Sequence, residues 1–454
     1  MTNAKTAQTK TAKVPYISRI GIDLLFGRYT YDLCTDNVDP SKLLILYGDN
    51  GSGKTTILKC IFHLLSPATN KGHRYALARI PFKRLSVDLG PDITVTAERS
   101  GSNLLGSFQM LLKIGGQSFS RSFEYDPATK NLTNKKADRG LFAKLQSLGL
   151  QIHFLSDERK IITDLIGPDD DEPDDDDDDP TERQKTFLVR TLRGQKLFTR
   201  TREGSSLERA MSRLVEWIRK QAITGAGAGQ VNANTLYSEI VRRIVNPYHR
   251  QTKQETPQLA NLIKDFREQA ERSISFAQFG LSAELPADDL IRSLEQQGAA
   301  GQAVLLEQIL RPFIDGFKLR LNALEPVYES VRTLVSTIDE FYREKRISFN
   351  LREGFTIVSD RGDTLAPSML SSGEKQLLLI LCNVLTSGDK TNVFIIDEPE
   401  LSLNVKWQRK LVDALLDCTR NSQVQFVLAT HSLELLTQHQ HNVVQLRPQI
   451  IARD

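Results

Sequence analysis

The stretch LLILYGDNGSGKTTILK, residues 43–59, decides what kind of fold this chain can form. Its first part is a continuous apolar run, which is typical of a strand buried on both faces of a parallel sheet. The loop GDNGSGKT that follows has the spacing G-x-x-x-x-G-K-[ST] and leads into a helical pattern. In this strand–loop–helix setting the glycines let the backbone wrap around a phosphate, with successive N–H groups pointing inward. The alternative, a glycine-rich turn with an unrelated lysine, does not explain that setting.

This loop therefore predicts a nucleotide site. We expect Lys54 to reach the β- and γ-phosphates, which makes it a candidate catalytic residue as well, and Thr55 to coordinate Mg²⁺. The residues expected to bind the nucleotide here are Asn50, Gly51, Ser52, Gly53, Lys54, Thr55 and Thr56.

The segment VFIIDEPE, residues 393–400, is a second apolar strand, and it ends in two adjacent carboxylates. A Mg²⁺ ion held by Thr55 needs an anionic partner, and Asp397 at the carboxyl end of the strand can supply it. Glu398, one residue further, would then orient and deprotonate the attacking water as a general base. The alternative is a strand that simply ends in a solvated turn.

The segment ATHS, residues 429–432, ends a third apolar strand, VQFVL. A single histidine is usually a packed or a surface residue. His431, however, lies at the carboxyl end of a predicted parallel strand, where the ligands of open α/β sheets bind. We therefore expect His431 to sense the nucleotide, and we count it among the candidate catalytic residues.

The stretch LSSGEKQ, residues 370–376, precedes an apolar helical run, LLLILCNVL. The exposed N–H groups at the start of a helix form an anion site, which suits a phosphate. An ordinary serine N-cap with Glu374 in the first turn is the simpler alternative. The candidate ligand-binding residues of this stretch are Ser371, Ser372, Gly373 and Glu374.

Size and composition predict a soluble cytoplasmic protein without a membrane partner. The chain has 454 residues, of which 40% are hydrophobic and 25% charged, as is usual for globular proteins. No apolar run approaches the roughly 20 residues of a membrane helix, and the polar, basic N-terminus does not have the pattern of a secretory signal. The four cysteines lie far apart in the sequence, which predicts reduced thiols.

The small net charge of +3 hides a strong asymmetry. Residues 169–179 contain ten carboxylates and one proline, and because such a run repels itself we expect a solvated loop. Residues 183–202 then carry seven lysines or arginines. This basic strip could contact the phosphates of DNA, or it could be the solvated face of strands or helices. DNA therefore stays open as a partner.

The order of the patterns predicts an α/β head domain that is interrupted by a helical insertion. The first part of the head, with the phosphate loop and an antiparallel β subdomain between Arg84 and Tyr125, spans residues 1–165. The acidic loop and the helical insertion span residues 166–345. The second part of the head spans residues 346–454.

Apolar residues at three-to-four spacing mark the helices of the insertion. The longest uninterrupted pattern runs from Leu324 to Lys345, which corresponds to about 33 Å at 1.5 Å per residue. Stretches rich in glycine and glutamine, at 224–230 and 296–302, separate it from other helical patterns. Long coiled-coil arms are therefore not expected.

Five motifs stand in a fixed order along the chain: GDNGSGKT, LSSGEKQ, IIDEPE, LSLN and ATHS. Together they resemble the ATP-binding-cassette (ABC) ATPase superfamily. The resemblance implies the fold of an ABC-ATPase head, a mixed sheet with a P-loop core and an antiparallel β subdomain. It also implies ATP and Mg²⁺ as cofactors, and hydrolysis of ATP to ADP and phosphate as the activity.

By the same resemblance, LSSGE corresponds to the signature motif. This implies that Ser371 and Gly373 contact the γ-phosphate of an ATP bound to a second subunit, and that residues 400–404 form the D-loop at the same interface. The protein would then be a homodimer or a higher homo-oligomer with composite ATP sites. The glutamine of the family's Q-loop has no clear counterpart, because the expected region offers Asp157 and Arg159 instead.

The segment DEPELSLN, followed by Trp407 and Gln408, is similar to the branch that contains Rad50, RecF and the overcoming-lysogenisation-defect (OLD) ATPases. The stretches ISRIGIDLLFGRYTYDL and LLILYGDNGSGKTTILK resemble stand-alone bacterial AAA-family ATP-binding proteins. That group includes anti-phage defence ATPases such as those of the PARIS and Septu systems. The implied function is a switch ATPase, the sensor or regulatory subunit of such a system, that controls a separate effector nuclease.

Two other functions remain as alternatives. One is a DNA-repair or chromosome-maintenance ATPase of RecF or SMC type that binds DNA. The other is a nucleotide-binding subunit of a transporter, which the long stretch between Thr55 and Ser371 argues against. The tail after His431 has too few carboxylates for the metal-dependent nuclease domain of OLD proteins, so we expect the chain itself to cut nothing.

Overall fold

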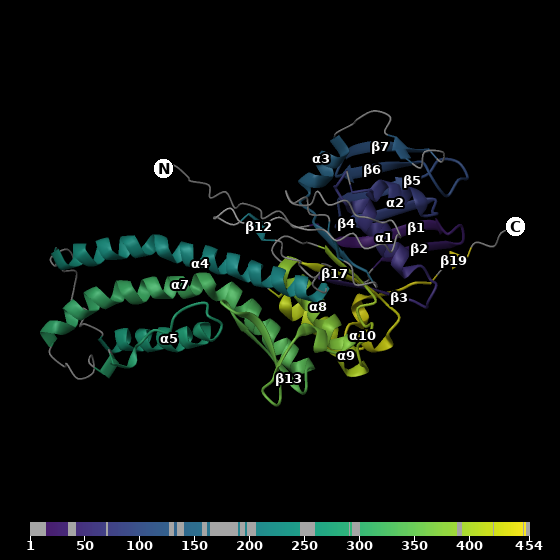
Figure 1. Cartoon of the computed structure of the whole chain (residues 1–454). Helices are drawn as coiled ribbons and strands as arrows, with labels where there is room; N and C mark the ends of the chain where they lie inside the picture. The colour runs from purple at the N-terminus through teal and green to yellow at the C-terminus, as the bar shows by residue number, and fades with distance from the viewer. Residues whose placement is uncertain are drawn as a thin grey trace, which may run out of the picture. The chain divides into compact units, whose positions relative to one another are not determined.

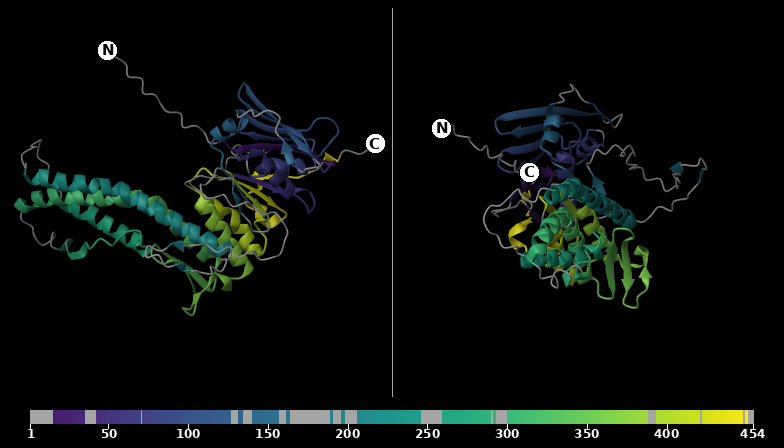
Figure 2. Two further views of the ribbon diagram at one scale, coloured as in Figure 1. Left: turned by 45° about the horizontal axis from the view of Figure 1, so that its top comes forward. Right: turned by 90° about the vertical axis from the view of Figure 1, so that its left-hand side faces the viewer.

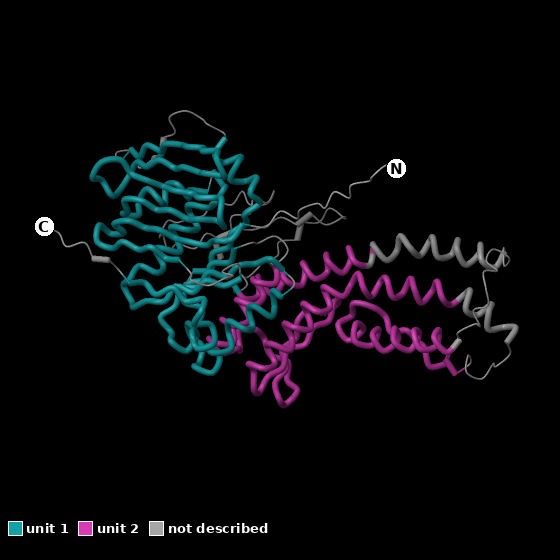
Figure 3. The backbone as a smooth tube through the Cα atoms, turned by 180° about the vertical axis from the view of Figure 1, so that it is seen from behind, with its two compact units in different colours: residues 1–206, 387–454 teal, residues 207–386 magenta. Residues whose placement is uncertain are grey.

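The computed structural model describes residues 15–34, 42–69, 71–126, 131–133, 140–156, 161–163, 189–190, 196–197, 206–245, 259–289, 291–292, 300–387, 393–420, 422–447 and 449–450. The chain forms two compact units, Met1–Ser206 with Ser387–Asp454, and Leu207–Thr386 (Figure 3). The acidic run, Asp157, Arg159 and most of the basic strip lie outside the described residues.

The described residues of the first unit include a six-stranded sheet that carries the phosphate loop. Its order is β10-β9-β16-β17-β3-β18, and all neighbours are parallel except β10 and β9. Every residue of β16 and β17 is buried, which explains why these segments are nearly continuous apolar runs. The strands are β3 (Leu43–Tyr47), β9 (Ile152–Leu155), β10 (Ile161–Thr163), β16 (Val393–Asp397), β17 (Gln425–Thr430) and β18 (Val443–Gln445).

An antiparallel sheet forms the other layer of this unit, with the order β19-β2-β1-β4-β5-β6-β7-β8 (Figure 1). The meander predicted between Arg84 and Tyr125 is confirmed as strands β4 to β7. The strands are β1 (Ile17–Leu25), β2 (Tyr29–Cys34), β4 (Arg84–Leu89), β5 (Ile93–Glu98), β6 (Phe108–Ile114), β7 (Gln117–Asp126), β8 (Asn131–Thr133) and β19 (Gln449–Ile450).

Helix α1 (Lys54–Leu65) fills the space between the two sheets. It contacts β5 of the antiparallel sheet and β9, β16 and β17 of the parallel one. Eight of its twelve residues are buried, as expected for a helix that is apolar on most sides. The unit also contains α2 (His73–Arg79), α3 (Gly140–Ser147), α9 (Val405–Cys418) and α10 (Leu433–Leu436). The start of α1 is thus anchored by the core of the whole unit.

The second unit contains three long helices within its described residues, α4 (Ser206–Val245), α5 (Leu259–Gln278) and α7 (Ala300–Phe341). Figures 1 and 2 show α4 and α5 running beside α7. The unit also includes α8 (Ser372–Ser387) and the strands β13 (Lys345–Asn350), β14 (Gly354–Ser359) and β15 (Thr364–Leu365). Of the apolar residues that the sequence pattern predicts on one face of α4 or of α7, Val215 is half-buried. The others are buried: Leu207, Met211, Leu214, Ile218, Leu324, Val327, Val331, Leu334, Ile338 and Phe341.

The predicted length of about 33 Å for the longest helix of the insertion, Leu324–Lys345, is wrong. Helix α4 has 40 residues and α7 has 42, which corresponds to about 60 Å each. The glycine-rich stretch at 224–230 continues α4 instead of ending it. A Cβ on Gly225 would lie 2.9 Å from the carbonyl oxygen of Ala323 on α7, so glycine allows the two helices to approach closely. Pro312 and Pro326 likewise lie inside α7.

These observations confirm the predicted fold class, an α/β head with a P-loop core sheet and an antiparallel β subdomain, interrupted by a helical insertion. The compact units divide the chain at other places than the predicted domains, because residues 346–386 group with the long helices. The boundaries predicted at residues 165 and 345 stay a prediction. Within the described part of the chain, no helix is both long enough and apolar enough to cross a membrane.

Candidate functional site

Three neighbouring strands of the parallel sheet end at one edge, and a predicted motif follows each of them. Asp397 at the end of β16 pairs with Ala429 of β17, and Thr430 of β17 pairs with Tyr47 of β3. Because the strands are parallel, the three segments that follow them leave the sheet at the same edge. The structure therefore places four residues predicted from three separate motifs at this edge, which are Lys54, Asp397, Glu398 and His431.

The phosphate loop between β3 and α1 is shaped by glycine and held by Tyr31. Gly51 and Gly53 have φ angles of 83° and 84°, in the left-handed region that glycine adopts without strain. The hydroxyl of Tyr31 donates a hydrogen bond of 2.7 Å to the carbonyl oxygen of Ser52. Burial raises the pKa of Tyr31 to about 12, so the hydroxyl keeps its proton and stays a donor at neutral pH.

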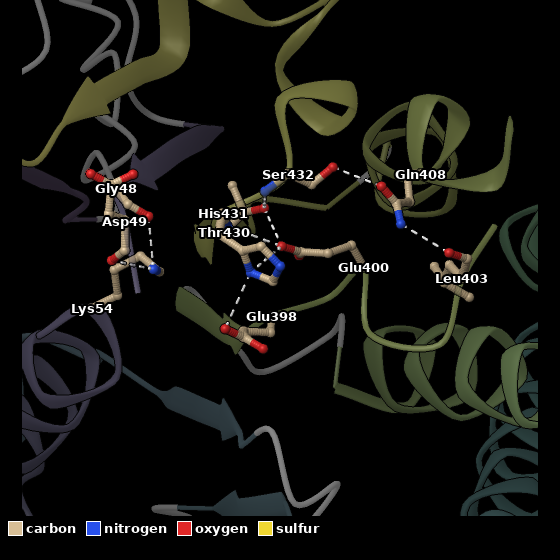
Figure 4. A network of polar contacts seen from close by, with 10 residues as sticks. All are labelled: Gly48, Asp49, Lys54, Glu398, Glu400, Leu403, Gln408, Thr430, His431 and Ser432. Carbon is tan, nitrogen blue, oxygen red and sulfur yellow. Dashed lines mark hydrogen bonds and ion pairs between the residues drawn. The ribbon is translucent and has the colours of Figure 1, made fainter. Parts of the chain in front are cut away.

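Lys54 is folded into this loop (Figure 4). Its side chain is buried, and its Nζ donates hydrogen bonds to the carbonyl oxygens of Gly48 at 2.8 Å and Asp49 at 3.0 Å. The hydroxyl oxygen of Ser52 is also buried, and it has no hydrogen-bond partner within the described residues. A buried ammonium group held by neutral carbonyls and an unsatisfied hydroxyl beside it both fit a phosphate ligand.

Thr55 and Asp397 have the ligand chemistry that Mg²⁺ prefers, a hydroxyl and a carboxylate oxygen. Thr55 is half-buried in the first turn of α1, and Asp397 is 2% exposed at the end of β16. The chemistry of these two residues therefore fits a Mg²⁺ ion. Of the other loop residues, Asn50 and Gly51 are exposed and Thr56 is half-buried.

The chain turns sharply after β16. Glu398 has a φ angle of 46°, a conformation that costs energy for a residue with a side chain. Its N–H donates to the carbonyl oxygen of Ala429 at 2.9 Å, and its own carbonyl accepts from the N–H of Leu401 at 3.0 Å. The neighbouring strand thus holds the strained turn in place. Strain of this kind is common at functional sites.

The ring of His431 lies beside two carboxylates (Figure 4). Its Nδ1 is 3.3 Å from Oε1 of Glu398 and 3.4 Å from Oε1 of Glu400. The side chain of His431 is 45% exposed, that of Glu398 26% and that of Glu400 only 4%. When Nδ1 carries the proton, the ring donates to a carboxylate, and Nε2 remains for another partner. Glu398 and His431, predicted from different motifs, are therefore neighbours.

Sequence reasoning missed two residues near this site. It assigned Glu400 only to the D-loop, because a third acidic residue in DEPE gives no sign that its side chain is buried. It did not single out Phe26 in the turn between β1 and β2. The one signal is the neighbouring Gly27, because glycine is common in turns between strands.

Phe26 lies next to the phosphate loop. It has a φ angle of 56°, and the turn is fixed by a hydrogen bond of 2.8 Å from its N–H to the carbonyl oxygen of Pro81. A Cβ on Gly53 would lie 3.4 Å from Cε2 of the Phe26 ring. The side chain is nevertheless 45% exposed. A strained turn therefore presents an aromatic ring beside Gly53, the N-cap residue of α1.

The residues of LSSGEKQ belong to the second unit. The hydroxyl oxygen of Ser371 accepts from the N–H of Glu374 at 3.3 Å, and Oε2 of Glu374 accepts from the N–H of Ser371 at 2.7 Å. This reciprocal pair is a capping box, so the simpler reading of the motif as a helix cap is confirmed. Ser371 and Ser372 are exposed and Gly373 is buried. The ligand-binding role of these residues stays a prediction.

Glu374 also connects α8 to the residue that follows α7 and to the first residue of β13. Lys345 Nζ donates to its two carboxylate oxygens at 2.8 and 3.0 Å, and the Tyr342 hydroxyl donates to its carbonyl oxygen at 3.0 Å. Burial raises the pKa of the Glu374 carboxyl, but hydrogen bonds from Lys345 and Ser371 outweigh burial and lower it overall. Because the pKa of the Glu374 carboxyl is lowered in the folded state, its contacts with Lys345 and Ser371 stabilise the fold at neutral pH. This stabilisation is lost as the pH falls through the folded-state pKa.

Comparison with known proteins gives one family and two partial relatives. The family described as "AAA domain, putative AbiEii toxin, Type IV TA system" matches residues 43–437. A segment of 122 residues is 31% identical to the "Retron Vc95 probable ATPase" of Vibrio cholerae serotype O1 biovar El Tor, covering 24% of this chain and 22% of that protein. A segment of 96 residues is 29% identical to the "Zinc import ATP-binding protein ZnuC" of Mannheimia succiniciproducens, covering 20% of this chain and 35% of that protein. The chain thus matches only about a fifth to a third of either relative's length.

Solved structures similar to this chain include two Smc heads. One is the Smc head domain of Pyrococcus furiosus with an extended coiled coil, bound to the C-terminal domain of ScpA, with 12% identity, a TM-score of 0.39 and 96% of each chain covered. The other is an SmcHead bound to the C-winged helix domain of ScpA, with 11% identity, a TM-score of 0.37, and 96% of this chain and 97% of that chain covered.

The family match begins at β3 and ends just after α10, so it includes the phosphate loop, the DEPE turn and His431. It spans well over half of the chain, and it agrees with the order of motifs and with the sheet that aligns them. This chain therefore belongs to the AAA-domain family described above, and the prediction of an ABC-type, Rad50-like ATPase is confirmed.

Proposed function

We propose that this protein binds ATP with Mg²⁺, hydrolyses it to ADP and phosphate, and uses the two nucleotide states as a switch. The observation that carries the proposal is the convergence of Lys54, Glu398 and His431 at adjacent strand ends of one sheet. Membership of an ATPase family supports the activity in general. The buried cation and the unsatisfied Ser52 hydroxyl in the loop support a phosphate ligand in particular.

The phosphate loop and Lys54 bind the β- and γ-phosphates, because N–H groups at a helix start and an ammonium group both complement negative charge. Thr55 and Asp397 would hold Mg²⁺, which would neutralise charge on the phosphates. Asn50, Gly51, Ser52, Gly53 and Thr56 supply the rest of the loop around the nucleotide.

Glu398 acts as the general base. It accepts a proton from the water that attacks the γ-phosphorus, while the bond from that phosphorus to the oxygen of the departing ADP breaks. His431, whose Nδ1 is 3.3 Å from the carboxylate, holds Glu398 in place and presents its other ring nitrogen to the site. The strained backbone conformation of Glu398 fixes the position from which its side chain leaves the main chain.

The second half of each ATP site comes from another copy of the chain. By the resemblance to ABC ATPases, Ser371, Ser372, Gly373 and Glu374 of one copy complete the site of its partner. The exposed hydroxyls of Ser371 and Ser372 at the start of α8 support this role, because a helix N-terminus attracts a phosphate. ATP would then hold a homodimer, or a higher homo-oligomer, in a closed state.

Phe26 forms a platform for the nucleotide base. Replacing it with alanine (Phe26→Ala) is expected to weaken ATP binding about 5- to 150-fold, since stacking of a base on an aromatic ring contributes roughly 1–3 kcal/mol. Binding of inorganic tripolyphosphate, which has no base, should be unchanged. Titration calorimetry with both ligands measures the two effects, and Phe26→Trp, which keeps an aromatic ring, is the control. An equal loss for ATP and tripolyphosphate would show that the residue only supports the loop.

We place this ATPase in a bacterial anti-phage defence system, as the subunit that controls a separate effector, a nuclease. Two observations support the placement: the resemblance of its motifs to the PARIS and Septu ATPases, and the segment shared with the probable ATPase of a retron. Control would pass through the helical insertion, the largest part of the chain that the ATP site does not need.

Expression in bacteria tests the placement. The protein alone should give no protection against phage, whereas co-expression with the product of a neighbouring gene should reduce plaque formation. The Lys54→Ala variant should remove that protection, because the nucleotide bound to the ATPase decides whether the effector is held or released. Cleavage of DNA or RNA by the purified chain alone would contradict a separate effector.

The alternative, an ATPase that binds DNA as repair and chromosome-maintenance proteins do, is favoured by one observation. Helices α4 and α7, with 40 and 42 residues, are much longer than the sequence pattern indicated. DNA affinity that depends on ATP and weakens as salt rises would support this alternative.

A further inference from the structure

A single carboxylate oxygen holds both the backbone and the ring of His431 (Figure 4). Oε1 of Glu400 accepts hydrogen bonds from the Thr430 hydroxyl and from the His431 N–H, the second at 3.1 Å. The same oxygen lies 3.4 Å from Nδ1 of the imidazole. Glu400 is therefore fixed to the end of β17 and to the side chain that follows it.

The contacts continue into a closed ring through the start of α9. The hydroxyl of Ser432 donates to Oε1 of Gln408 at 2.7 Å, and Nε2 of Gln408 donates to the carbonyl oxygen of Leu403 at 2.9 Å. The N–H of Leu403 in turn donates to the carbonyl oxygen of Glu400 at 2.9 Å. The turn after β16 and the turn after β17 are thus joined at two places, once by Glu400 and once by Gln408.

Burial of the Glu400 side chain lowers the stability of the folded protein. The side chain is 4% exposed, and its Oε2 is buried without a hydrogen-bond partner among the described residues. A buried carboxylate loses its hydration, and donors must compensate this loss. Here all the compensation comes through Oε1, from the segment that carries His431. A buried carboxylate whose contacts all come from Thr430 and from the backbone and ring of His431 indicates a role in placing that histidine.

We propose that Glu400 is a positioning residue for ATP hydrolysis, an inference that rests on the function proposed above for Glu398 and His431. Glu400 fixes the rotamer of the ring and keeps the proton on Nδ1, so that Nε2 is directed to the site. Because Nδ1 is almost equally far from Glu398 and Glu400, both carboxylates can accept a hydrogen bond from the same N–H group of the ring. Any movement of the turn that contains Glu400 then changes how His431 holds the general base.

A double-mutant cycle tests this inference. Glu400→Ala is expected to lower kcat for ATP roughly 10- to 100-fold, by analogy with the loss found when residues that orient a metal ligand are removed. The dissociation constant for ATP should not change, because Glu400 does not bind the nucleotide. In a His431→Ala background, Glu400→Ala should cause little further loss. Glu400→Gln keeps an acceptor for Thr430 and His431 and should recover part of the activity.

The matched control is Glu434→Gln, which changes an exposed carboxylate paired with Arg409 and should leave kcat unchanged. If Glu400→Ala does not fold, Thr430→Val removes one of the two donors while keeping the shape of the side chain, and it should lower kcat in the same direction. Losses from Glu400→Ala and His431→Ala that multiply independently would overturn the inference, as would a wild-type kcat in Glu400→Ala.

A second measurement does not depend on hydrolysis. In protein labelled with nitrogen-15 in histidine, the ring signals of His431, identified by their loss in His431→Ala, report which nitrogen carries the proton. Glu400→Ala should shift these signals towards a mixture of tautomers, and Glu434→Gln should not. Unchanged signals in Glu400→Ala overturn the positioning role even if the protein hydrolyses ATP. An inactive wild-type protein with the expected shift would instead contradict the proposed ATPase activity alone.

Discussion

Glu398→Gln is expected to keep ATP bound but to slow its hydrolysis by about 10²–10⁴-fold, the usual contribution of a general base. The substitution keeps the shape of the side chain and its contact with His431, since the amide oxygen can still accept from Nδ1–H. It removes the negative charge that accepts the proton of the attacking water. The strained φ angle of 46° and the hydrogen bond to Ala429 involve only the backbone, so the turn should be preserved.

Single-turnover hydrolysis and equilibrium ATP binding, measured on the same preparations, separate chemistry from affinity. Glu434→Gln is again the control, because it removes a carboxylate at the surface of the same unit. The variant should also accumulate in the ATP-bound, more associated state, which light scattering detects. A wild-type rate in Glu398→Gln would assign the base to another residue, and Glu400 is then excluded by its burial.

The core of the site could be predicted from sequence because each of its parts is local. A phosphate loop needs a buried strand, glycines and a helix start in consecutive positions, and residues 43–59 contain all three. The strands that lead to Asp397 and His431 are nearly continuous apolar runs because both faces of the sheet are covered. Parallel pairing then aligns their carboxyl ends whatever the rest of the chain does.

What could not be predicted depends on contacts between distant segments. Gly225 looks like a helix breaker in sequence, but it lies inside α4 because α7 passes too close for a side chain. Glu400 looks like one more solvated carboxylate, and only the fold shows that its Oε1 accepts hydrogen bonds from Thr430 and His431. Phe26 becomes relevant only when the turn after β1 is placed beside Gly53. None of these relations leaves a periodic pattern in the sequence.

Two inactive variants are expected to restore activity when they are mixed, if ATP sites are shared between copies. Lys54→Ala removes the buried ammonium group, and it should weaken ATP binding about 10- to 100-fold, because a hydrogen bond to a charged group contributes roughly 1.5–3 kcal/mol. Ser371→Arg leaves the phosphate loop intact and places a bulky cation at the exposed start of α8. Each variant alone should hydrolyse ATP at background rate.

Ser371→Arg also removes one half of the capping box with Glu374, and loss of such a cap costs about 0.5–2 kcal/mol. A melting curve should therefore show a modest loss of stability without unfolding. Because Ser371 is exposed, the arginine side chain has room outside the folded unit. Nucleotide binding by this variant should match that of the wild type, which shows that the defect lies in completing a site and not in forming the loop.

In a mixed dimer, one composite site combines both defects and the other combines two intact halves. If subunits mix at random in equal amounts, half of the dimers are mixed and half of their sites work, so about a quarter of the wild-type rate should return. In the control, Lys54→Ala is mixed with a double variant that carries both Lys54→Ala and Ser371→Arg. No phosphate loop in this mixture is intact, so no activity should return. Full activity of Ser371→Arg alone would show that α8 takes no part in the site. Recovery that depends on the intact Lys54 of one copy and the intact Ser371 of the other is expected only from a site built by two copies.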